Sequence, residues 1–150
     1  MCRGTWPTAR GFDRSFSLIS GGTSYFHPKE LTLDDKFYIP PENAYLTDLI
    51  GDFSVDFVSR HAESHPDDPF FLYVAFTAPH FPLEAPEESI AKYRDVYKKG
   101  WDRLREERYA RMREMKIIRD EWSLPPRPDN VPAWEDVSQE EKSRQVENMA

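Results

Sequence analysis

The chain has 150 residues, of which 39% are hydrophobic and 31% charged, and its formal net charge is -7. This charge argues against a general nucleic-acid binder, because affinity for the phosphate backbone comes from Lys and Arg side chains. The longest apolar run, residues 70–76, is too short for a membrane span, which takes about 20 residues. The single cysteine, Cys2, excludes an internal disulfide framework and a multi-cysteine zinc site.

The first half of the chain predicts an α/β arrangement. Residues 1–44 are loop-rich, with short candidate strands at residues 11–16 and 36–39. Apolar residues then recur at helical spacing from position 46 to position 57, which predicts an amphipathic helix. Residues 70–76 are apolar on both faces, as in a parallel strand that helices cover on both sides. A helix, a buried strand and a turn are therefore expected over residues 45–85.

The second half is expected to be mostly helical. Residues 86–122 carry two helical patterns, and residues 123–137 form a proline-rich connector that Trp134 anchors. Ser138 opens a further helix over residues 138–150, and no glycine or proline closes it. The chain is therefore expected to stop inside an element, as a piece of a longer protein.

One helical stretch is locally basic. Residues 100–119 hold seven Lys or Arg against four Asp or Glu, an excess of 7 - 4 = 3. The stretch could be a docking face or an ordinary solvated helix surface, and the interleaved acidic residues favour the solvated surface.

His80 is the leading candidate for chemistry. It follows the predicted strand, and Pro79 and Pro82 on either side of it restrict the local backbone. An imidazole held in this way can donate to an anionic oxygen or pass a proton to a leaving group near neutral pH. The alternative is a turn histidine that only ends the strand.

The other candidates have ordinary structural explanations. His27 fits a packed aromatic loop, and His61 and His65, which could share a metal at i,i+4 spacing, fit a helix C-terminus. Two carboxylate pairs lie where aspartate commonly forms turns, and Cys2 has no evident base partner. These pairs are Asp34 with Asp35 and Asp67 with Asp68.

Residues 69–86 resemble the segment PFFLYLAYTAPHWPLQAP of the sulfatase family, the arylsulfatases in particular. The likeness continues in order through residues 10–16, 45–48 and 93–115, and into the helix that begins at Ser138. It implies an incomplete sulfatase catalytic domain over residues 1–150, with a partial alkaline-phosphatase-like fold. It also implies the hydrolysis of a small-molecule or glycan sulfate ester.

In that family a cysteine converted to formylglycine attacks sulfur, while a divalent cation, usually calcium, holds the sulfate. Only His80 falls on a catalytic position, that of the histidine that contacts the sulfate group and the leaving-group oxygen. The family's Cys-x-Pro-x-Arg motif and its metal-binding carboxylates are absent, and the segment at Cys2 does not fit the motif. Formylglycine and the calcium ligands are therefore expected outside this chain, which by itself should be inactive.

Two other interpretations remain open. One is a phosphonate or phosphate ester hydrolase of the same superfamily, because these residues omit the nucleophile that separates the two activities. The other is a catalytically inert remnant, or an interaction fragment that uses the charged helix at residues 100–119. The sequence does not indicate the compartment or the oligomeric state.

Overall fold

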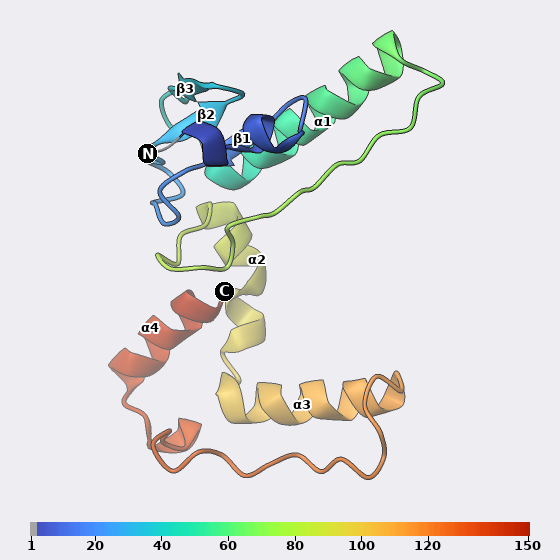
Figure 1. Cartoon of the computed structure of the whole chain (residues 1–150). Coiled ribbons are helices and arrows are strands. Elements are labelled where there is room, and N and C mark those ends of the chain that lie inside the picture. The colour runs from blue at the N-terminus through green and yellow to red at the C-terminus, as the bar shows by residue number, and fades with distance from the viewer. Residues whose placement is uncertain (1–2) are drawn as a thin grey trace. The chain divides into compact units, whose positions relative to one another are not determined.

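The computed structural model describes residues 3–150, which fall into two compact units, Met1–Glu84 and Ala85–Ala150. Figure 1 shows the strands and the longest helix in the first unit and three further helices in the second. In the described part of the chain, no helix is both long and apolar enough to cross a membrane.

The first unit contains a small antiparallel sheet in the order β1-β2-β3. Its strands are β1 (Phe16–Leu18), β2 (Leu31–Leu33) and β3 (Lys36–Tyr38), and two short 3₁₀ helices, η1 (Arg3–Thr5) and η2 (Pro7–Arg10), precede them. Asp34 lies in the tight turn between β2 and β3 at φ 53°, a left-handed conformation that aspartate tolerates. Its carboxylate accepts hydrogen bonds from the Ser15 N–H and the Arg14 side chain, which holds the start of β1 against the turn.

Helix α1 (Leu46–Ser64) covers this sheet and confirms the helix predicted from apolar spacing. Leu46 is 1% exposed and packs in the core of the unit with Tyr25 and Leu31. The Phe53 ring of α1 stacks on the Phe16 ring of β1, with centroids 4.3 Å apart. The apolar face of the helix therefore finds its partner in the sheet and in the loop before it.

The prediction of a buried parallel strand at residues 70–76 is wrong. This segment forms no strand, and the exposed fractions of its large apolar side chains run from 36% at Leu72 to 77% at Phe71. Figure 1 shows it as a long irregular trace that follows α1. A strand is defined by hydrogen bonds to a neighbouring strand, and no segment within residues 3–150 pairs with this one.

Of the short candidate strands, residues 36–39 match β3, whereas residues 11–16 overlap β1 only at Phe16. Strand β2 was not predicted. Its sequence, Leu31-Thr32-Leu33, is too short to show a clear alternation.

The second unit contains helices α2 (Glu87–Tyr97), α3 (Gly100–Glu114) and α4 (Gln139–Met149), with a short 3₁₀ helix, η3 (Trp134–Asp136), before α4. Arg94 of α2 binds Glu147 of α4 at 2.7 Å. Ser138 accepts a hydrogen bond from the Glu141 N–H, which confirms the predicted start of the last helix.

Trp134 anchors the proline-rich connector, as predicted. Its ring packs against the Trp101 ring with centroids 4.6 Å apart, and its backbone N–H donates to the Asp102 carboxylate at 2.8 Å. Arg127 of the connector binds the same carboxylate at 3.2 Å. Asp102 therefore ties the first turn of α3 to two points of the connector.

Candidate active site

His80 lies in a turn that follows the extended segment, and its side chain is exposed. The turn closes through a hydrogen bond from the His80 N–H to the Thr77 carbonyl at 3.0 Å. The peptide bonds before Pro79 and Pro82 are both cis. The imidazole is thus presented to solvent from a short turn and is not enclosed among apolar side chains.

The His80 ring is oriented by the carbonyl oxygen of the next residue. Nδ1 lies 2.7 Å from the Phe81 oxygen, and a carbonyl can only accept, so Nδ1 carries the hydrogen. Nε2 has no hydrogen-bond partner among the described residues. In neutral His80 this nitrogen therefore offers a lone pair, and only the imidazolium form can donate from it.

A small pocket of about 130 Å³ adjoins this turn. Thr77 also lines it, and its hydroxyl oxygen is buried and has no hydrogen-bond partner in the part of the chain that the structure describes. Buried hydroxyl groups are normally hydrogen-bonded, so this one is an exception. The residues that line the pocket are Leu18, Gly21, Gly22, Thr23, Tyr25, Thr77, His80 and Phe81.

Residues distant in the sequence hold this turn. The Tyr25 hydroxyl donates to the His80 carbonyl at 2.9 Å. The Glu84 carboxylate accepts from the Ser24 hydroxyl at 2.8 Å and from the Tyr25 N–H at 2.7 Å. Sequence reasoning missed Ser24, Tyr25 and Glu84, because no local pattern links positions 55 to 60 residues apart.

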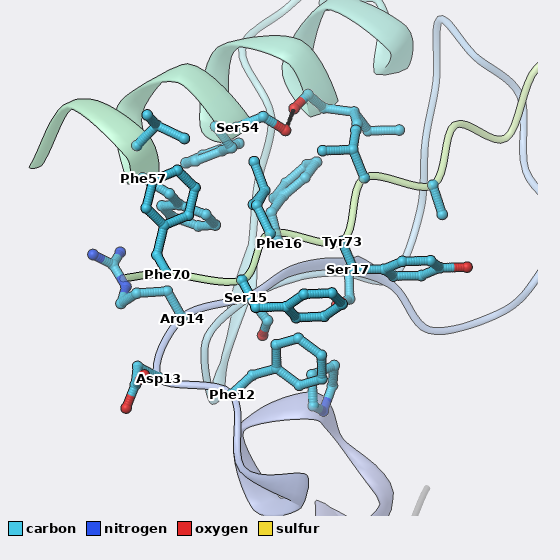
Figure 2. Close-up of a pocket in the computed structure, with 18 of the residues that line it drawn as sticks. Phe12, Asp13, Arg14, Ser15, Phe16, Ser17, Ser54, Phe57, Phe70 and Tyr73 are labelled. Carbon is cyan, nitrogen blue, oxygen red and sulfur yellow. Dashed lines mark hydrogen bonds between the residues drawn. The ribbon is translucent and has the colours of Figure 1, made fainter. Parts of the chain in front are cut away.

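A larger pocket of about 730 Å³ has mostly apolar walls. Figure 2 shows aromatic rings around it from three segments: Phe12 and Phe16, then Phe57 of α1, then Phe70. Arg14 on its wall is bound to Asp34 at 3.0 Å, with its guanidinium 4.9 Å from the centre of the Phe57 ring. The larger pocket therefore offers packing surface, whereas His80 lines only the smaller one, and Thr77 borders both.

None of the other three histidines lines the small pocket beside His80. The rings of His61 and His65 stack with centroids 5.6 Å apart, and His61 Nε2 lies 2.9 Å from the Asp68 carbonyl. His65 Nδ1 lies 2.8 Å from the Ser64 hydroxyl, so these two rings serve the C-terminal end of α1. The exposed His27 lines neither pocket described above.

The carboxylate pairs also serve local structure. Asp34 binds Arg14, and Asp35 accepts from the Thr8 hydroxyl at 2.5 Å. The Asp68 N–H donates to the His65 carbonyl in the turn after α1, and Asp67 is exposed. Cys2 lies outside the described residues. Within residues 3–150, no group of three or more His, Cys, Asp or Glu side chains could hold a metal ion.

The charged helix α3 pairs several of its ions within the second unit. Glu107 accepts from Lys99 at 2.5 Å and from Arg103 at 2.9 Å. The hydrogen bond from Lys99 is the largest cause that lowers the pKa of Glu107. Desolvation opposes this effect, and the hydrogen bond from Arg103 adds to the lowering. Arg113 binds Asp120 at 3.1 Å. This pairing favours a solvated surface over a free basic face.

The chain was compared with known proteins. The family described as "Sulfatase" matches residues 1–140. An uncharacterized sulfatase of Schizosaccharomyces pombe is 30% identical over 162 residues, which cover 96% of this chain and 28% of that protein. An arylsulfatase of Klebsiella aerogenes is 30% identical over 81% of this chain and 28% of its own length. Arylsulfatase J of Mus musculus is 32% identical over 71% of this chain and 18% of its own length. The chain therefore spans less than a third of the length of each of these relatives.

Proposed function

This chain belongs to the sulfatase family, and we propose that it is part of an enzyme that hydrolyses sulfate esters, with His80 as the residue that contacts the sulfate and protonates the leaving group. Family membership supports the reaction class, because two of the relatives named above are arylsulfatases. The observation that carries the role of His80 is the geometry of its ring: Nδ1 is bonded to a backbone carbonyl, and Nε2 is left for a ligand.

The proposed role requires a second proton on His80. In the imidazolium form, Nδ1–H stays on the Phe81 carbonyl while Nε2–H donates to a sulfate oxygen. When the sulfur–oxygen bond of the ester breaks, negative charge gathers on the leaving-group oxygen. The Nε2 proton then moves to that oxygen, which leaves neutral His80 in the Nδ1–H form, and solvent returns the proton.

Thr77 lines the same small pocket as His80, and its buried hydroxyl has no hydrogen-bond partner among the described residues. A hydroxyl can donate to an anionic oxygen, so a small shift of this side chain would let it assist His80 in holding a sulfate group. The surroundings of the pocket include the backbone of Gly21 and Gly22, where no side chain fills the space.

The family's calcium ion and formylglycine do not fit the residues described here. The described residues hold no cluster of carboxylates or histidines suited to a metal ion, and the sequence around Cys2 does not match the family's Cys-x-Pro-x-Arg motif. We therefore assign no step at residues 3–150 to either group, and propose that other parts of the enzyme carry both.

Replacement of His80 tests this function. In the full-length protein, His80→Ala should lower turnover of a chromogenic aryl sulfate by about 10²- to 10⁴-fold, the usual contribution of a positioned proton donor. Initial rates of the two proteins, measured under the same conditions, check this expectation.

His27→Ala is the matched control, because His27 is an exposed histidine that lines neither pocket described above. An aryl phosphate tested in parallel distinguishes a sulfatase from the phosphate ester hydrolase that the sequence leaves open. Equal turnover in His80→Ala and His27→Ala would remove His80 from the mechanism.

A further inference from the structure

The turn that presents His80 is attached to the rest of its unit at both ends. We propose that Tyr25 and Glu84 are positioning residues, which together fix the backbone of residues 80–84 and so orient the His80 ring. We call this pair, with its hydrogen bonds, the Tyr25–Glu84 clamp. Its importance for catalysis rests on the proposed function, whereas its effect on the ring can be measured without activity.

Tyr25 is the first point of attachment. Its side chain is 3% exposed and packs in the core with Leu31 and Leu46, so its phenol group starts from a rigid base. The Tyr25 carbonyl also accepts from the Leu46 N–H at 2.8 Å, which ties it to the start of α1. From this base the hydroxyl donates to the His80 carbonyl at 2.9 Å. The core of the unit therefore holds the backbone of His80 in place through the Tyr25 hydroxyl.

Glu84 is the second point. Its Oε2 accepts from the Ser24 hydroxyl and the Tyr25 N–H, at 2.8 and 2.7 Å. Bonds of this length to a carboxylate are charge-assisted and stronger than neutral ones. The Ser24 oxygen accepts from the N–H groups of Phe26 and His27, which leaves its own hydrogen for Glu84. The Glu84 carbonyl accepts from the Tyr45 hydroxyl at 3.3 Å.

The ring partner of His80 lies between these two attachments. Phe81, whose carbonyl receives the Nδ1–H, follows the residue that Tyr25 holds and precedes Glu84 by three positions. If either attachment is lost, the Phe81 carbonyl is free to turn away from Nδ1. The ring can then rotate, and its hydrogen can lie on either nitrogen. Nε2 is then no longer always the unprotonated nitrogen that a ligand can contact.

The first experiment measures the tautomer of His80 by ¹⁵N NMR of the 150-residue chain, at a pH where the ring is neutral. The unsubstituted chain should show the Nδ1–H form. Tyr25→Phe and Glu84→Leu should each give a mixture of the two tautomers. Glu84→Gln should keep the Nδ1–H form, because its amide oxygen can still accept both hydrogen bonds.

Tyr73→Phe is the matched control, because it removes the same hydroxyl from a tyrosine that is 72% exposed. A general loss of stability lowers the population of folded chain but does not redistribute the tautomers within it. A tautomer ratio that is the same in Tyr25→Phe, Glu84→Leu and Tyr73→Phe overturns the clamp. If Glu84→Leu does not fold, Ser24→Ala, which removes one of the two bonds to Glu84, takes its place.

The second experiment measures kcat and KM in the full-length protein. Tyr25→Phe should lower kcat by about 10- to 100-fold with a smaller change in KM, because a small displacement of a reacting group is costly. A kcat equal to that of Tyr73→Phe counts against positioning. If His80→Ala also leaves turnover intact, the proposed function fails, and the tautomer measurement still decides whether the clamp orients the ring.

Discussion

The position of one hydrogen on the His80 ring decides which ring nitrogen donates a hydrogen bond and which one accepts. The Phe81 carbonyl takes the hydrogen of Nδ1, so the two ring nitrogens are not equivalent. Nε2 of His61 faces the Asp68 carbonyl, and Nδ1 of His65 faces the Ser64 hydroxyl. Among these three histidines, only His80 lines the small pocket. The donor and acceptor roles of the His80 ring therefore depend on hydrogen bonds to the backbone as much as on the imidazole itself.

The ionisation of Glu107 gives a second prediction at this scale. Hydrogen bonds from Lys99 and then Arg103 lower its pKa in the folded chain. The folded form is therefore favoured at pH values above the ordinary glutamate pKa of about 4.3, and this contribution disappears as the pH falls through the lower, folded value. NMR titration of the Glu107 carboxyl in Lys99→Gln should show a higher midpoint than in the unsubstituted chain.

Lys92→Gln is the control for that titration, because Lys92 is exposed and has no ion-pair partner among the described residues. Added salt should also raise the midpoint, since it screens exposed charges. An unchanged midpoint in Lys99→Gln would contradict the assigned cause.

At the scale of elements, the helices could be predicted, whereas only β3 of the three strands could. Leu46, Leu49 and Phe53 repeat at helical spacing, and Ser138 is a typical N-cap, so these signals are local. Residues 70–76 have a strand composition, yet pairing is decided by segments distant in the sequence. The same limit explains the site. His80 is proposed from its neighbours in the sequence, whereas Tyr25 and Glu84 are 59 positions apart and no local pattern links them.

Gly100 determines how α3 begins. Its φ is 80°, and a Cβ at this position would lie 2.2 Å from Cγ of Trp134. Gly100→Ala combines left-handed strain with overpacking and should lower the free energy of unfolding by about 2–4 kcal/mol. Chemical denaturation followed by tryptophan fluorescence measures this change.

Gly51→Ala provides the comparison for that experiment. Gly51 lies within α1, and a Cβ there would meet no atom within 4 Å. Alanine is the better helix former, so this variant should be more stable by about 0.5–1 kcal/mol. Equal effects of the two substitutions would show that Trp134 does not constrain Gly100.

At the scale of the whole molecule, the apolar segment of residues 70–76 is exposed to solvent. The chain spans 28% of the length of two of its relatives. Within residues 3–150, the backbone of residues 70–76 makes no hydrogen bond, and Phe71 and Tyr73 are 77% and 72% exposed. An extended apolar segment with unpaired backbone groups is a template for pairing with another chain.

The 150-residue chain should therefore self-associate as its concentration rises, and Tyr73→Lys should reduce that association. A charge in the segment opposes the close approach of two copies. Sedimentation velocity over a range of concentrations measures the effect. Tyr93→Lys is the control, since Tyr93 is 51% exposed on α2. Equal association of the two variants would place the contact elsewhere.

The packing of Trp101 against Trp134 has a spectroscopic consequence. The two indoles meet edge to face with centroids 4.6 Å apart, inside the unit of residues 85–150, whereas Trp6 belongs to the other unit. Indoles this close couple their electronic transitions, so the pair should produce a circular dichroism band that an isolated indole does not have. That band gives residues 85–150 an optical signal of their own, by which their melting can be followed separately from that of the half that carries His80.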